Sequence, residues 1–120
     1  MSNQIVRFTS THQEDIEEVM ERGYWTHSKR PSKLKIGDTV YVVPNRKELD
    51  RGKILCVKGI AASLPMEVPA QVWTSTEDNT HRYVQQVDLH CVEWVLFHEL
   101  PEEVRNANAS ITGIRYIKQD

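Results

Sequence analysis

The chain has 120 residues, of which 39% are hydrophobic and 27% are charged, and its formal net charge at pH 7 is -2. This balance is typical of a folded domain and is too apolar for a disordered tail. The slight excess of acid argues against a surface that is basic overall, although it is compatible with a local basic site. We therefore expect a single domain over residues 1–120.

Neither a membrane span nor a secretion signal is expected. No stretch approaches the roughly 20 apolar residues that a bilayer requires, and the opening MSNQIVRFTS lacks a basic flank followed by an apolar run. The two cysteines, Cys56 and Cys91, stand in apolar, strand-like segments and not in a CxxC pair, so we expect reduced, buried thiols. These features favour a cytoplasmic protein without a membrane partner.

The first elements are a strand and a helix. QIVRFT, residues 4–9, is rich in β-branched and aromatic residues and predicts the strand. Residues 11–22 predict the helix, which Ser10 or Thr11 would cap and Gly23 would end. The apolar residues that recur on one face of this helix, and that we expect to pack on a sheet, are Ile16, Val19 and Met20.

An ordered loop is predicted over residues 23–35, which contain a proline and little apolar periodicity. IGDTVYVVP, residues 36–44, then predicts a strand, with Asp38 accepting backbone amide bonds in the turn at its entrance. NRKELDRG, residues 45–52, is typical of a charged hairpin connection.

The partner strand of this hairpin is predicted at KILCVKGIAA, residues 53–62, where Gly59 marks a bulge or bend. Two prolines between residues 61 and 69 indicate an irregular path before VPAQVWTS, residues 68–75, resumes as a strand. TEDNTH, residues 76–81, then supplies a turn.

A long extended run, RYVQQVDLHCVEWVLF, fills residues 82–97. Its apolar positions change phase near Cys91 and Val92, which predicts a β-bulge or sharp bend there. Trp94, beyond the phase change, is expected in the core. LPEEVRNA then predicts a short helix that begins around Pro101, and TGIRYI predicts a closing strand.

This order of elements predicts an α+β fold. We expect a curved, mostly antiparallel sheet or a small β-barrel, with one main N-terminal helix and short additional helices. A bend in the long strand is how one strand serves two sides of such a barrel.

The clearest candidate site is the segment after the first helix. Five acids fall between Glu14 and Glu21, and five bases fall between Arg22 and Lys35 with no acid among them. A run of charged residues is commonly just a solvent-exposed face. This basic segment, however, also contains Tyr24, Trp25 and His27. Cations beside flat rings are what phosphate contact and base stacking require. The alternative role for the tryptophan, Trp25, is to anchor the loop in the core.

No catalytic or metal-binding pattern is evident. The five histidines show neither HxxxH nor HExxH spacing, and the chain has no GxSxG and no phosphate-cradling glycine loop. We expect no catalytic residue, no metal and no cofactor.

The layout resembles the PUA-like superfamily, and within it the EVE, YTH and ASCH group of small domains that bind RNA or modified bases. The resemblance rests on the initial strand, the amphipathic helix, the basic aromatic segment GYWTHSKRPSKLK and the strand entry KIGDTVYVV. It implies a non-catalytic nucleic-acid reader that holds a modified, flipped or unpaired base of DNA or RNA in an aromatic-walled basic pocket. By this resemblance the pocket would be bordered by Tyr24, Trp25, Ser28 and Trp73, and the phosphates would be contacted by Lys29, Arg30, Lys33 and Lys35.

The competing interpretation is a protein-interaction module. An adaptor or immunity-type protein would use the acidic face of the helix or the exposed strands, and the mildly acidic chain favours it. The oligomeric state stays open.

Overall fold

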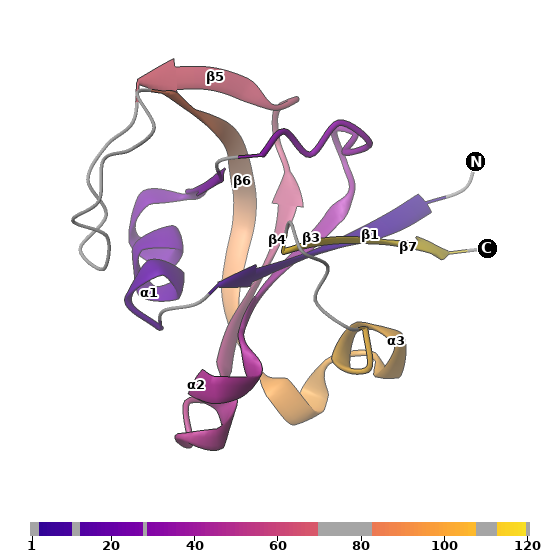
Figure 1. Cartoon of the computed structure of the whole chain (residues 1–120). Coiled ribbons are helices and arrows are strands. Elements are labelled where there is room, and N and C mark those ends of the chain that lie inside the picture. The colour runs from indigo at the N-terminus through magenta and orange to yellow at the C-terminus, as the bar shows by residue number, and fades with distance from the viewer. Residues whose placement is uncertain (1–2, 11–12, 28, 70–82, 108–112, 120) are drawn as a thin grey trace.

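The computed structural model describes residues 3–10, 13–27, 29–69, 83–107 and 113–119 (Figure 1). Its strands are β1 (Asn3–Ser10), β2 (Tyr24–His27), β3 (Thr39–Pro44), β4 (Leu55–Ala61), β5 (Met66–Pro69), β6 (Tyr83–Leu96) and β7 (Ile114–Gln119). Its helices are α1 (Gln13–Arg22), α2 (Arg46–Asp50), the 3₁₀ turn η1 (Phe97–Glu99) and α3 (Glu102–Arg105). Within the described ranges no helix has the length and apolar character to cross a membrane.

The described strands form one sheet in the order β2-β6-β4-β3-β1-β7, with β5 paired to β6 beside this path. Strands β1 and β3 run parallel, and the other pairs are antiparallel. The fold is thus α+β, with a strongly curled, mostly antiparallel half-barrel and few helices, as the order of elements predicts (Figure 1).

The curl is visible in contacts between strands that are not neighbours in the sheet. Phe8 on β1 and Trp25 on β2 are four positions apart in strand order, yet their ring centroids lie 5.8 Å apart. The ring of His27, also on β2, lies 6.4 Å from that of Phe8. The sheet therefore folds back until its two sides meet across an apolar interior.

This interior is the larger core. Strand side chains from both ends of the sheet point into it, and Ile16 and Val19 of α1, both fully buried, close its open side. Met20 packs against the same cluster, so the predicted apolar face of the helix is confirmed. The strand residues of the inner core are Val6, Phe8, Trp25, Val40, Val42, Val57, Ala61, Val87, Leu89 and Ile114.

A second core lies on the outer face of the sheet. There η1 and α3 cover the alternate residues of β1, β3 and β4, since successive side chains of a strand point to opposite faces. The members of this outer core are Ile5, Tyr41, Val43, Cys56, Leu100 and Val104. Arg7 shares this side of β1 and is 6% exposed.

The predicted bulge in the long strand is present. The register of β4 against β6 shifts between Lys58 and Ile60, and Cys91 has a φ of 55°. Gly59 lies opposite the bulge, where an added β-carbon would stand 3.2 Å from Cγ1 of Val92. The two sequence signals, a glycine in one strand and a phase change in the other, therefore mark the same irregularity.

Two local expectations were wrong. Residues 24–27 are strand β2 and not loop, because Trp25 pairs opposite Val87 and is buried against the inner core. Residues 66–67, expected to be irregular, pair with β6 as the first half of β5, so this strand begins before residue 68, where it was predicted to start. In these two strands, sheet pairing outweighed a weak local pattern. The hairpin between β3 and β4 is confirmed by their antiparallel pairing, and its connection also contains α2, which Asn45 caps by accepting a hydrogen bond from the amide of Glu48.

Two burial expectations were also wrong. Trp94 is 41% exposed, because it lies beyond the bulge, near the end of β6, and belongs to neither core. Cys91 is exposed, since the bulge interrupts the alternation of inward and outward side chains along β6, whereas Cys56 is buried. Both are free thiols, as predicted. The strand and turn predicted over residues 70–81 lie outside the described residues.

Candidate functional site

The predicted basic segment continues after β2 as a loop, residues 29–38, which we call the basic loop. Pro31 and Leu34 are buried and hold it against the fold. Between and beside these two anchors, the cations point to solvent. The exposed basic residues of the loop are Lys29, Arg30, Lys33 and Lys35. The spacing of the anchors therefore turns the charges outward.

Hydrogen bonds fix the path of the basic loop at its C-terminal end. The carboxylate of Asp38 accepts a bond from the amide of Lys35 at 2.8 Å, as predicted for this turn, and a second from Nε2 of Gln4 at 2.8 Å. Nε2 of Gln4 also donates to the carbonyl of Lys33 at 2.6 Å. The amide of Gly37 donates to Ala61 at 2.8 Å, which ties the loop to β4. The cations are thus carried on a preorganised backbone.

Trp25 is a core residue. It is 5% exposed and packs beside Phe8 in the inner core. In this position its ring faces are covered by protein, so its place in the fold agrees with the anchoring role and offers no surface for stacking on a base.

Two tyrosines are more accessible than Trp25, and one of them contacts the basic loop. Tyr24 is half-buried, and its hydroxyl accepts a hydrogen bond from Arg22 at 3.4 Å. Tyr116 of β7 is half-buried, lies 5.8 Å from the ammonium of Lys33, and accepts a bond from the amide of Lys33 at 3.3 Å. Burial raises the pKa of the Tyr116 phenol, so it stays neutral at physiological pH. Tyr116 was not singled out by the sequence, because it is distant along the chain.

The predicted residues are therefore partly brought together. Lys29, Arg30, Lys33 and Lys35 lie along the loop, whereas Tyr24 lies at the far end of β2, with the length of that strand between it and the loop. Ser28 and Trp73 lie outside the described residues. The part of the chain that the structure describes holds no group of three His, Cys, Asp or Glu side chains arranged to bind a metal.

The acidic residues form a separate surface on α1. Those that face solvent recur at helical spacing, as expected for the face opposite the apolar stripe. They are Glu14, Glu17 and Glu21. Their neighbours Asp15 and Glu18 are buried instead, Glu18 in an ion pair with Arg22 at 3.5 Å. The acidic stripe is thus distinct from the basic loop.

A pocket lies between the start of α1 and the turn that joins α2 to β4. Its volume is about 390 Å³, within the range of small-ligand sites. It lies at the end of β3 opposite the basic loop, because that loop precedes β3 and α2 follows it. Its lining residues are Gln13, Glu17, Gly52, Lys53, Ile54 and Leu55. No sequence pattern singled these residues out.

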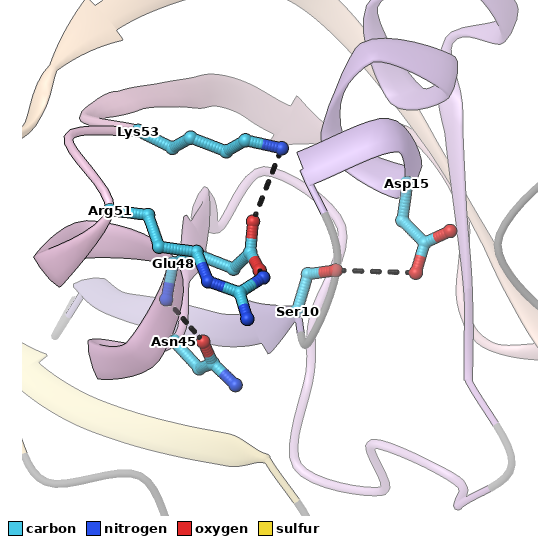
Figure 2. Close-up of polar contacts among 6 residues, drawn as sticks. All are labelled: Ser10, Asp15, Asn45, Glu48, Arg51 and Lys53. Atoms are coloured by element: carbon cyan, nitrogen blue, oxygen red, sulfur yellow. Dashed lines mark hydrogen bonds and ion pairs between the residues drawn. The ribbon is translucent and has the colours of Figure 1, made fainter.

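Glu48 organises the wall of this pocket. Its carboxylate is buried and binds Arg51 at 3.2 Å and Lys53 at 3.4 Å, so the turn after α2 wraps around one acid (Figure 2). Figure 2 also shows Ser10 donating a hydrogen bond of 3.3 Å to Asp15 beside it, where β1 gives way to α1. These contacts hold the two sides of the pocket in place.

A scan against protein-family models and a search of curated proteins found no match to this chain.

Proposed function

We propose that this chain is a non-catalytic nucleic-acid reader with a PUA-like half-barrel, which binds an unpaired, flipped or modified base beside its basic loop. The observation that carries the proposal is the basic loop itself: four exposed cations on a backbone held by Pro31 and Leu34 and by Asp38. Phosphate contacts need positive charge at fixed positions, and a preorganised loop supplies them without the cost of ordering.

The aromatic part of the proposal shifts from Trp25 to Tyr116. Base stacking requires a ring with an accessible face, and each stacked base contributes about 1–3 kcal/mol. Tyr116 is half-buried and contacts Lys33 of the loop, whereas Trp25 is covered and Tyr24 lies at the far end of β2. We therefore assign stacking to Tyr116 and leave Trp25 as the anchor of β2.

The test is a fluorescence-anisotropy titration of the whole chain. The probes are short fluorescein-labelled oligonucleotides: single-stranded DNA, single-stranded RNA, duplex DNA, and duplex DNA with one 5-methylcytosine or one mismatch. A reader of an unpaired base binds single strands or the mismatched duplex more tightly than the plain duplex, because extruding a paired base costs a few kcal/mol. A reader of a modified base prefers the methylated duplex.

Substitutions separate the two kinds of contact. Replacing Lys29 and Arg30 by Ala is expected to weaken binding to every probe, and replacing Tyr116 by Ala is expected to reduce the preference among probes. The matched control removes Arg46 and Lys47, two exposed cations of α2 at the other end of β3. If the wild type binds none of the probes at low salt, or if the control pair weakens binding as much as the loop pair, the proposal fails.

The competing function, a protein-interaction module, is favoured by a different observation. The exposed acidic stripe of α1 borders the pocket at the far end of the sheet, and Glu17 belongs to both. That surface does not overlap the basic loop, so the two functions are compatible.

A further inference from the structure

One residue that lines the pocket between α1 and the α2–β4 turn has a buried polar atom without a partner. Gln13 is 7% exposed, and within the described part of the chain its Oε1 has no hydrogen-bond donor. Leaving a buried carbonyl oxygen without a donor is costly, so nearly all such atoms are satisfied. A turn of the Gln13 side chain toward the pocket would let the N–H of a ligand supply the missing bond.

The pocket also carries a charge on each side. Lys53 and Arg51 share the single carboxylate of Glu48, so this side holds two cations for one anion. Glu17, on the α1 side, is an exposed carboxylate. The pocket is therefore positive toward the α2–β4 turn and negative toward the helix, which suits a ligand with an anion and a cation at separate positions.

An apolar patch forms the third part of the site. Ile54 and Leu55 line the pocket and are 41% and 40% exposed. Leu55 pairs with Leu96, so Trp94, two residues earlier on β6, is its diagonal neighbour on the same face, and Trp94 is exposed as well. Three of the large exposed hydrophobic residues thus gather at one end of the sheet, which is uncommon on a surface with no partner.

We propose that this pocket binds the C-terminal end of a peptide whose last residue is large and apolar and whose preceding residues are basic. The terminal carboxylate binds Lys53, and the last backbone N–H donates to Oε1 of Gln13. The apolar side chain lies on Ile54 and Leu55. The basic residues before it face Glu17 and the rest of the acidic stripe. A backbone amide, a terminal anion and an apolar side chain occur together in the last residue of a peptide.

A peptide fits better than a free amino acid because the surface extends beyond the pocket. Trp94 continues the apolar patch past Leu55, and Glu14 and Glu21 continue the acidic stripe past Glu17. An amino acid would fill the pocket and leave these residues uncovered. The site is at the other end of β3 from the basic loop, so it does not depend on the proposed nucleic-acid function.

The test uses a fluorescein-labelled pentapeptide, GGKKL, with a free terminal carboxylate. Two comparison peptides are its C-terminal amide and the same sequence ending in serine, GGKKS. Titration of the whole chain, by anisotropy and by chemical shifts of ¹⁵N-labelled protein, is expected to show the free acid binding about tenfold tighter than either comparison peptide. The shifted amides should include those of Gln13, Lys53 and Leu55.

Substitutions test each contact separately. Lys53→Met keeps the aliphatic stem and is expected to remove the preference for the free acid over the amide. Gln13→Leu keeps a side chain of similar size but removes the acceptor oxygen, and it is expected to weaken binding of both the free-acid peptide and its amide. The matched control for Lys53→Met is Lys47→Met, which removes an exposed cation outside the pocket lining and should bind the peptide as the wild type does. Far-ultraviolet circular dichroism checks that each variant is folded.

Several outcomes would overturn the proposal. Equal binding of the acid and the amide, or an unchanged preference in Lys53→Met, would exclude capture of a terminal carboxylate. If free leucine binds as tightly as GGKKL, the ligand of the pocket is an amino acid and not a peptide. If the chain self-associates and this blocks peptide binding, the pocket binds a second copy of the chain. Absence of shifts at millimolar peptide would exclude the site altogether. The Lys29 and Arg30 variant should leave peptide binding intact, so the two proposals fail independently.

Discussion

Replacing Arg7 by Met is expected to destabilise the fold through the packing of α3. The guanidinium is buried, and its Nη1 donates to the carbonyls of Val104 at 2.6 Å and Ala107 at 2.9 Å, with a longer contact of 3.3 Å to Arg105. These carbonyls belong to the last turn of α3 and the residues after it. Arg7 therefore joins the first strand to the short helix that covers the outer core.

The magnitude follows from the two short bonds. Hydrogen bonds to a charged group contribute about 1.5–3 kcal/mol each, which gives an upper range of about 3–6 kcal/mol. Two effects reduce it: the freed carbonyl of Ala107 is partly open to water, although that of Val104 is buried, and removing Arg7 also removes the cost of burying a charge, the same burial that lowers its pKa. We expect a net loss of about 2–4 kcal/mol, or a fall in Tm of about 8–15 °C for a domain of this size.

The assay is urea unfolding at equilibrium, with amide hydrogen exchange as a second readout. The matched control is Arg46→Met, since Arg46 is an exposed arginine of α2. We expect the control to change stability by no more than about 0.5 kcal/mol. In the Arg7 variant, the amides of Arg105 and Asn106 should exchange faster than in the control. An Arg7 variant as stable as the control, or more stable than the wild type, would refute this account of how α3 is held.

Four other outcomes are expected from local features of the fold. Cys91 should react rapidly with a thiol reagent in the folded protein and Cys56 only after unfolding, because the first is exposed and the second is fully buried; two rapid thiols would contradict this. Cys91→Gly should raise the free energy of unfolding by up to about 1 kcal/mol in urea, and Cys91→Val should lower it, because a φ of 55° disfavours a β-branched side chain. Gly59→Ala should destabilise the fold by about 1–3 kcal/mol in the same assay, because the new methyl would press on Val92 at 3.2 Å. Burial raises the pKa of Cys56 from 9.0 to about 12, so this thiol ionises at lower pH in the unfolded chain than in the folded one. The protonated thiol therefore contributes its full stabilisation below about pH 9, and this contribution is lost as the pH rises toward 12. Cys56→Val should flatten the pH dependence of the unfolding midpoint over that window.

The sequence was most informative where one segment carries its own periodic pattern. Ile16 and Val19 recur with the helical period and are fully buried, and the glycine and the phase change of the β4–β6 pair located the bulge. Such patterns work because the buried side of an element dictates its spacing. They fail where tertiary pairing decides: β2 is only four residues long, and it is a strand because β6 lies beside it.

The residues of the candidate sites likewise differ in how far the sequence could predict them. Lys29 and Arg30 are exposed, as expected for charged side chains of a loop, and their contact with phosphates stays a prediction. The burial of Trp25 depends on Phe8, a residue of another strand, and no local pattern reports that contact. Gln13 and Lys53 meet at one pocket only because the start of α1 and the turn after α2 are neighbours in space. Sites assembled from distant segments require the fold before they become visible.

The salt dependence of oligonucleotide binding tests the central claim most directly. The affinity of the wild type for a single-stranded probe is measured by anisotropy over a series of salt concentrations and compared with that of the variant lacking Lys29 and Arg30. If these cations bind phosphates, the slope of log affinity against log salt should become shallower by about 0.7 per lost contact on a single strand, while the control lacking Arg46 and Lys47 keeps the wild-type slope. An unchanged slope in the loop variant, or no binding by the wild type at low salt, would contradict the assignment of this chain as a nucleic-acid reader.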